Sequence, residues 1–191
     1  MNALEVSHYY NTGSVNAQNS LTLATRLGDM LCKAEEKYGQ RDQSWTVLGV
    51  EFGSNGPYIW FPQGKGIVIQ LGLTALNDTL NASYQLAHEC IHLLSPCGSS
   101  VVPVIEEGLA TVFSAIYIAE EFDVIYNTDD APYAEAATLV RELLSTYPDA
   151  ISRLRAVEPA FTKITTQTFV QAGLEVSSSL MGKLLASFKR N

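Results

Sequence analysis

The sequence predicts an α+β fold, in which a small antiparallel sheet packs on one central helix and the later part of the chain is helical. β-Forming residues gather between residues 45 and 73, a helical pattern precedes them, and helical patterns follow one another from about residue 77 onward. With 191 residues, 47% of them hydrophobic and 17% charged, the chain can bury a sizeable core but is short for two independent ones. We therefore expect a single domain, residues 1–191.

The first third of the chain changes from a helical to an extended pattern. Residues 18–39 carry leucines and other apolar residues near helical spacing and end at a glycine, which predicts an amphipathic helix. Three short runs rich in β-formers follow at 45–52, 58–61 and 66–73, and the turn 53–57 separates the first two. Because the connections between these strands are short, we expect them to pair antiparallel.

The remainder of the chain reads as a series of helices. Polar residues at 77–81 offer N-caps for a helix that runs to Leu94 and is stopped by Pro96. Apolar residues occur on nearly every face of this helix, so we expect it to be buried at the centre of the fold. Further helices are predicted at 104–122, at 133–146, in a short segment after Pro148, at 166–173 and at 176–189.

The net charge of −8 is unevenly distributed along the chain. Residues 1–149 contain 6 Lys and Arg against 18 Asp and Glu, a balance of −12, whereas residues 150–191 contain 6 against 2, a balance of +4. Phosphate binding needs a basic face, so the acidic body argues against nucleic acid as a partner. We interpret the basic residues near the end as solvated helix faces and partners of helix C-termini, namely Arg153, Arg155, Lys163, Lys183, Lys189 and Arg190.

The compartment is indicated by the N-terminus and the cysteines. Residues 1–10 lack the basic and apolar regions of a secretory signal, and no apolar run approaches the ~18–20 residues that span a bilayer. We therefore expect no membrane partner. Cys32, Cys90 and Cys97 are an odd number and form no disulfide framework, so we expect reduced, mostly buried thiols in a cytoplasmic protein. A Cys90–Cys97 bridge is the alternative if the protein works outside the cell.

The run His88-Glu89-Cys90-Ile91-His92 is the sharpest feature of the sequence. On a helix, residues i and i+4 lie one turn apart on the same face, so both imidazoles can bind one metal ion. Glu89 is rotated by about 100° and can hold a metal-bound water as general base without being a ligand. The chain has only three histidines, and a buried pair of them needs polar partners. We therefore predict a zinc site here, with Cys90 on the core side.

The third protein ligand must be a carboxylate, because no third histidine lies nearby. Glu106 and Glu107 begin the next predicted helix and point about 100° apart, so only one of them can reach the ion. Gly108 is expected to allow a close approach between this helix and the one that carries the histidines, and the small residues Ala110 and Ser114 keep that approach open.

His88 to His92, followed by Glu107-Gly108-Leu109-Ala110, resembles the gluzincins, the zincin metallopeptidases whose third ligand is a glutamate on a following helix. The resemblance covers about residues 66–114, although the 14 residues between His92 and Glu107 form a shorter spacer than in the larger members. It implies a zincin-like fold in which 66–73 is the edge strand, with Glu107 as the zinc ligand. Glu106 is then expected to complement the helix dipole and contact a ligating imidazole from behind.

These residues lead us to expect a zinc-dependent metallopeptidase that cleaves a peptide or protein substrate, with a catalytic core in 1–125 and a helical part in 126–191. Zincins often add a side chain that stabilises the oxyanion, and Tyr126 and Tyr133 are our candidates for it. Two alternatives stay open: an inactive zincin-like binding module, against which the intact Glu89 argues, and a metallohydrolase with a non-peptide substrate.

Overall fold

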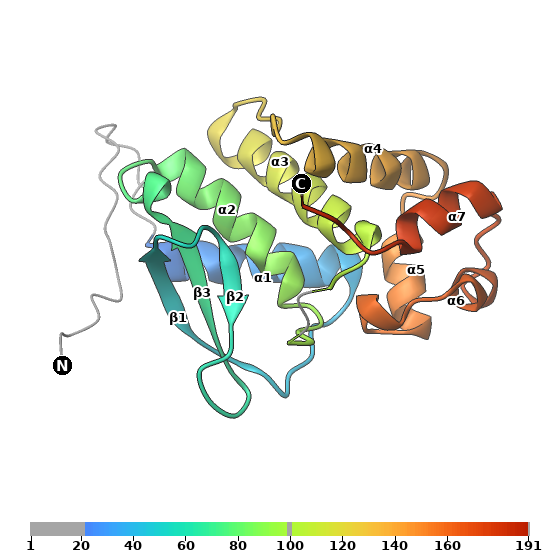
Figure 1. The fold of residues 1–191 in the computed structure, drawn as a ribbon, viewed down its shortest axis with the longest axis horizontal. Coiled ribbons are helices and arrows are strands. Elements are labelled where there is room, and N and C mark those ends of the chain that lie inside the picture. The colour runs from blue at the N-terminus through green and yellow to red at the C-terminus, as the bar shows by residue number, and fades with distance from the viewer. Residues whose placement is uncertain (1–21, 99–100, 191) are drawn as a thin grey trace.

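The computed structural model describes residues 22–98 and 101–190, which form an α+β fold as predicted (Figure 1). Each predicted helix and strand occurs, but the last helix ends at Leu185 rather than at residue 189, and residues 18–21 of the first predicted helix lie outside the described residues. In chain order the elements are α1 (Leu23–Tyr38), β1 (Thr46–Gly53), β2 (Tyr58–Trp60), β3 (Gly66–Gly72), α2 (Thr79–His92), α3 (Val104–Phe122), α4 (Ala131–Thr146), α5 (Ala150–Val157), α6 (Thr166–Gln171) and α7 (Ser178–Leu185).

The sheet is mixed, so the prediction of an antiparallel sheet is wrong for one of its two pairings. The strand order is β1-β3-β2; β1 runs parallel to β3 with Thr46 opposite Gly66, and β2 runs antiparallel to β3 with Tyr58 opposite Gln70. The chain reverses direction between β1 and β2 and again between β2 and β3, as expected, but β3 lies between β1 and β2 in the sheet. It takes the central place because it is the most deeply buried strand, with six of its seven residues inaccessible to solvent.

This order also changes which strand lies at the edge of the sheet. The family resemblance suggested residues 66–73, but β3 is central and β2 is an edge strand. Since β2 pairs with β3 on one side, the other side of β2 presents a row of backbone N–H and C=O groups that no strand of the described sheet uses.

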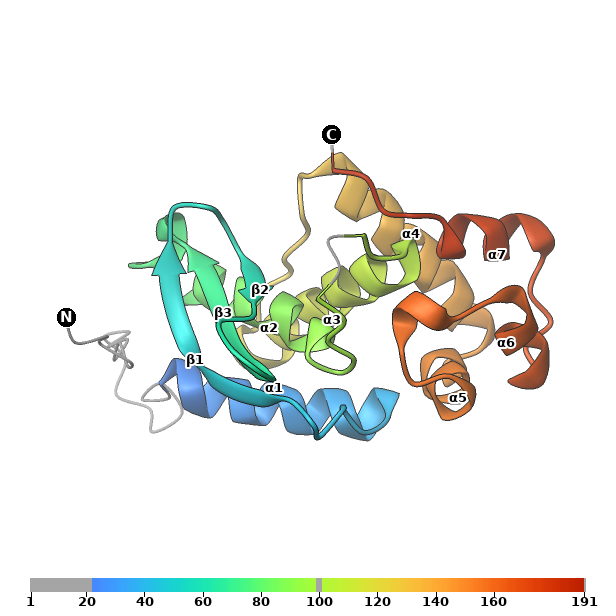
Figure 2. The same ribbon diagram turned by 60° about the horizontal axis from the view of Figure 1, so that its bottom comes forward.

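Helix α2 lies at the centre of the molecule, between the sheet and α3 (Figures 1 and 2). Helix α1 runs along α2 and the sheet, α4 covers α3, and α5 to α7 lie at the end remote from the sheet. Every residue of α2 from Leu86 to His92 is buried, as is every residue of α3 from Ile105 to Ser114. Within the described ranges, no helix combines the length and the apolar character that a membrane span requires.

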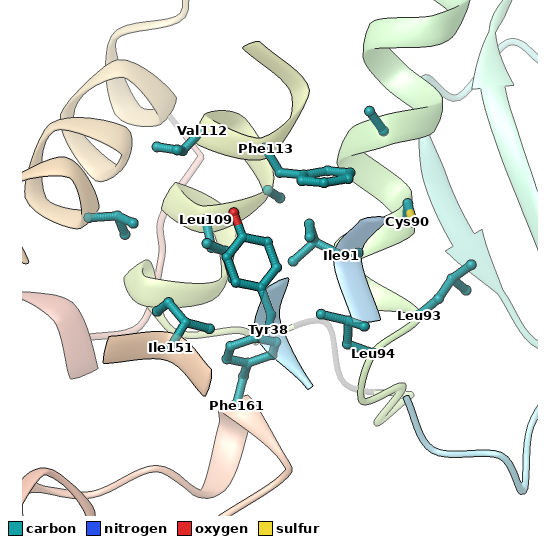
Figure 3. Close-up of a cluster of buried hydrophobic side chains, with 14 of the residues drawn as sticks. Tyr38, Cys90, Ile91, Leu93, Leu94, Leu109, Val112, Phe113, Ile151 and Phe161 are labelled. Atoms are coloured by element: carbon teal, nitrogen blue, oxygen red, sulfur yellow. The ribbon is translucent and has the colours of Figure 1, made fainter. Parts of the chain in front are cut away.

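The two central helices meet across a hydrophobic core (Figure 3). Ile91 from α2 and Leu94 just after it pack with Leu109 and Phe113 from α3. The ring of Tyr38 from α1 meets that of Phe113 edge-on, with 6.1 Å between the ring centroids. Close packing of this kind permits little movement of one helix relative to the other. Polar side chains on the facing turns of α2 and α3 are therefore held at defined separations.

The cysteines are less buried than the sequence suggested. Cys90 is fully buried in the core, as predicted, whereas Cys32 on α1 and Cys97 in the loop after α2 are exposed. All three are free thiols, so the alternative Cys90–Cys97 bridge does not form.

Arg155 corrects the interpretation of the basic residues as solvated. Its side chain is only 4% exposed, and burial lowers the pKa of its guanidinium. The guanidinium donates hydrogen bonds to the carbonyl oxygens of Tyr38, Gly39, Gln40, Leu94 and Pro159. Such a fork of N–H donors suits converging carbonyl groups. Arg155 therefore joins the ends of α1 and α2 to α5.

Gly108 is required for a close contact, but with α4 rather than with α2 as we predicted. A Cβ atom at this position would lie 2.3 Å from the carbonyl oxygen of Ala136 and 2.7 Å from a methyl group of Val140, both on α4. The carbonyl is backbone and cannot rotate away. The glycine thus fixes α3, and with it the turn that carries Glu106 and Glu107, against the layer formed by α4.

Replacing Gly108 by Ala is expected to lower the free energy of unfolding by about 1–3 kcal/mol, because the added methyl group must push α3 and α4 apart. Gly182→Ala in α7 is the matched control, since a Cβ there meets nothing within 4 Å. Helix propensity should make that control neutral or more stable by up to about 1 kcal/mol. Urea unfolding followed by circular dichroism measures both, and equal behaviour of the two variants would contradict the packing argument.

Candidate metal centre

The last turns of α2, which carry the two histidines, pack against α3. Asp78 is its N-cap, and the Asp78 carboxylate accepts a hydrogen bond from the backbone N–H of Asn81. The helix then continues without a break to His92, so His88 and His92 lie one turn apart on one face. Their ring centroids are 5.3 Å apart. Both side chains are almost completely buried, at 10% and 11% exposure.

The structure brings His88, His92 and Glu107 together. His88 Nε2 lies 3.1 Å from Glu107 Oε2, His92 Nε2 lies 3.9 Å from the same oxygen, and the three ligand atoms are all within 4.8 Å of one another. Tetrahedral zinc with ligands at about 2.0–2.1 Å would hold them about 3.3 Å apart. The separation of 3.1 Å is close to that value and that of 3.9 Å is somewhat longer. Two imidazoles with one carboxylate are a donor set that suits zinc.

Glu106 lies behind the second imidazole. Its Oε1 atom accepts a hydrogen bond of 2.8 Å from His92 Nδ1, and its side chain is 3% exposed. A proton held on Nδ1 leaves the lone pair of the neutral imidazole on Nε2, the nitrogen that faces Glu107. The two adjacent glutamates of α3 therefore face different sides of the same imidazole. Carboxylates in this first turn of α3 are also favoured by the helix dipole.

The charges of this cluster shift the pKa values of its members. Burial alone would lower the pKa of His92, but the hydrogen bond and charge of Glu106 and the charges of Glu107 and Glu89 outweigh burial and raise it. Burial alone would raise the pKa of Glu107, but the hydrogen bond from His88 and the charges of both imidazoles outweigh burial and lower it. In the absence of a metal ion, the surrounding carboxylates thus favour a proton on the His92 imidazole, at the position that a metal ion would occupy.

Glu89 is 2% exposed and borders a cleft. Among the described residues its carboxylate accepts no hydrogen bond. Burial raises its pKa, and the nearby charges of His92 and His88 oppose that rise. A buried carboxylate without a protein donor needs a water molecule or a ligand as partner. Its position next to the three clustered donors suits a group that binds and deprotonates water.

The cleft beside the cluster has a volume of about 580 Å³. Strand β2 with Phe61 lines it, as do Val102 and Phe188. The same cleft is lined by Glu89 and His92 from α2 and by Glu106 and Glu107 from α3. The free edge of β2 therefore borders the same space as the clustered donors.

The two candidate tyrosines lie in different places. The Tyr133 ring meets the His88 ring at 5.5 Å between centroids, and both burial and the charge of Glu107 raise the pKa of its hydroxyl. Tyr126 stacks on Tyr84 at 4.4 Å and lines a separate hollow. The structure thus brings Tyr133 to the His88 ring, whereas Tyr126 contacts Tyr84 and is not among the residues that line the cleft.

Three features of the cleft escaped the sequence reasoning. The sequence predicts β2 as a strand but not as part of the site, places Phe188 in a helix over 176–189 and interprets Arg190 as a solvated charge, whereas both residues follow α7 and line the cleft. The sequence signal was weak, because a basic residue near the end of a chain resembles any solvated charge. Only the path of the chain after α7 places them at the cleft.

Comparison with family models, with curated proteins and with solved structures finds no match to this chain. The function must therefore be argued from the side chains themselves.

Proposed function

We propose that this protein is a zinc-dependent metallopeptidase of zincin type. The observation that carries the proposal is the convergence of His88, His92 and Glu107 beside an uncommitted Glu89, in a cleft bordered by the free edge of β2. A closed structural site uses all four positions of the ion, whereas three protein ligands leave one for water. The donor set supports a catalytic zinc, and the free strand edge supports a peptide as substrate.

The protein groups divide the work of hydrolysis among them. Zinc, when bound, polarises the scissile carbonyl and activates water. Glu89 takes the proton of the attacking water and transfers it to the leaving nitrogen as the C–N bond breaks. An extended peptide pairs with β2 through backbone hydrogen bonds, which places the carbonyl groups of the peptide in the cleft. The Tyr133 hydroxyl is the proposed donor to the developing oxyanion.

The test is hydrolysis of a mixture of quenched fluorescent peptides by the purified protein. We expect cleavage that a chelator abolishes and added zinc restores. A variant with His88→Ala and His92→Ala, purified in parallel, should hold no zinc and show no activity. Stoichiometric zinc without cleavage of any peptide would contradict the peptidase proposal and favour a binding module or a non-peptide hydrolase. Equal zinc content in the double variant would contradict the metal site.

Zinc affinity is expected to rise with pH. His92 has a raised pKa, so in the metal-free protein its imidazole is protonated at neutral pH, and zinc must displace that proton. As the pH rises toward this pKa, a larger fraction of the metal-free protein has already lost the His92 proton, so zinc binding has less to displace. Lowering the pH has the opposite effect. We expect the apparent Kd to fall about tenfold per pH unit between about pH 7 and 8. Chelator competition measures the Kd, and a pH-independent value would contradict the assignment.

A further inference from the structure

The segment that follows α7 is attached to the start of the helix that carries Glu106 and Glu107. Ser187 forms an antiparallel bridge with Pro103. The backbone N–H of Val104 donates to the carbonyl of Ala186 at 2.9 Å, and the N–H of Phe188 donates to the carbonyl of Val102 at 2.8 Å. Figure 1 shows this segment crossing in front of α3. These bonds hold the segment at the rim of the cleft.

Successive residues of this extended segment point in opposite directions, as in a strand. Arg190 lines the cleft of the metal cluster, Lys189 lines a different hollow beside α4, and Phe188 borders both. The neighbouring basic residues Lys189 and Arg190 therefore face different spaces.

Arg190 lies close to the clustered donors. Its guanidinium carbon is 5.6 Å from the centre of the Tyr133 ring, and that ring is 5.5 Å from the centre of the His88 ring. Among the described residues that line the cleft, Arg190 is the one Lys or Arg, beside three glutamates. Within the described part of the chain its guanidinium forms no salt bridge. The stacking on Tyr133 holds the side chain over the site while its N–H groups stay available.

We propose that Arg190 is a specificity residue that binds a carboxylate of the substrate next to the scissile bond. This inference rests on the proposed function and names its substrate class: peptides with an anionic group, which is either the free C-terminal carboxylate or an Asp or Glu side chain. A guanidinium binds a carboxylate through two parallel hydrogen bonds, and such a pair discriminates strongly against a neutral amide. The acidic surroundings make the contact selective, because they repel any anion that does not reach Arg190.

A different role for the same side chain makes a different prediction. If Arg190 stabilised the oxyanion, its loss would lower kcat for all peptides alike. If it binds a substrate carboxylate, its loss raises KM, and lowers kcat/KM, for anionic peptides alone.

The experiment compares one peptide in three forms: with a free C-terminal carboxylate, with a C-terminal amide, and as the amide with Glu in place of Gln beside the scissile bond. The proteins are the wild type, Arg190→Ala, Arg190→Lys and the control Lys189→Ala, all zinc-loaded and checked by thermal unfolding. We expect the wild type to prefer one anionic form over the neutral amide by about 10–100-fold in kcat/KM. Arg190→Ala should lose this preference, Arg190→Lys should keep part of it, and Lys189→Ala should keep all of it. Which anionic form is preferred identifies the source of the carboxylate.

Binding of the same peptides, measured by calorimetry with and without zinc, separates this inference from the proposed function. If no peptide is cleaved but the wild type binds the anionic form more tightly and Arg190→Ala does not, the peptidase proposal fails and the inference stands. Equal binding and turnover of anionic and neutral peptides by the wild type would overturn the inference. An unchanged preference in Arg190→Ala, or an equal loss of activity toward all three peptides, would overturn it as well.

Discussion

Replacement of Glu89 by Gln is expected to lower kcat for peptide hydrolysis by about 10²–10⁴-fold while zinc stays bound. The two side chains have the same shape, and Glu89 is 2% exposed, so the buried volume is kept. Glutamine cannot accept the proton of the attacking water, which is the task assigned to this carboxylate. Because His88, His92 and Glu107 are untouched, the metal site should be preserved.

Steady-state kinetics measures the loss, and metal analysis of the same preparation measures the zinc content. An equivalent change on a glutamate remote from the cleft, Glu36→Gln on the exposed face of α1, is the control and should leave turnover unchanged. Loss of zinc from Glu89→Gln would show that Glu89 is a ligand. Full activity with zinc retained would show that Glu89 takes no part in the reaction.

Truncation of Glu107 to Ala is expected to weaken zinc binding far more than truncation of its neighbour Glu106. Glu107 Oε2 faces Nε2 of both histidines, so its loss leaves a site with two protein ligands. Glu106 contacts only Nδ1 of His92, and removal of such an outer contact lowers metal affinity by about 10–100-fold. The side chains of Glu106 and Glu107 are buried to nearly the same extent, at 3% and 5% exposure. Each variant therefore controls for the loss of stability that removal of a buried side chain causes.

Competition with a chromophoric chelator gives both affinities, and circular dichroism confirms that both variants fold. If Glu106→Ala loses the metal and Glu107→Ala keeps it, the ligand assignment is off by one residue. Similar losses in both would indicate that the two carboxylates act as one unit, with the orientation of His92 as essential as the third ligand itself.

The sequence by itself determined the α+β class, the positions of the helices and strands, and the residues of the cluster. Those features depend on local chemistry. Helical spacing places His88 and His92 on one face of α2 whatever surrounds the helix, and the pair of glutamates at the start of α3 is visible in the chain. In the structure Glu107 faces both imidazoles and Glu106 contacts the back of one of them, and the assignment of Glu107 as the metal ligand stays a prediction.

Tertiary structure decided what depends on residues distant in the chain. Strand order is one case, because short connections allow β3 either outside β2 or between β1 and β2, and burial of the apolar β3 selects the central place. The partner of Gly108 is another, since a small residue indicates a close approach but not from which side. Arg190 is the third: its placement rests on backbone pairing between segments about 85 residues apart, and no local pattern encodes such long-range contacts.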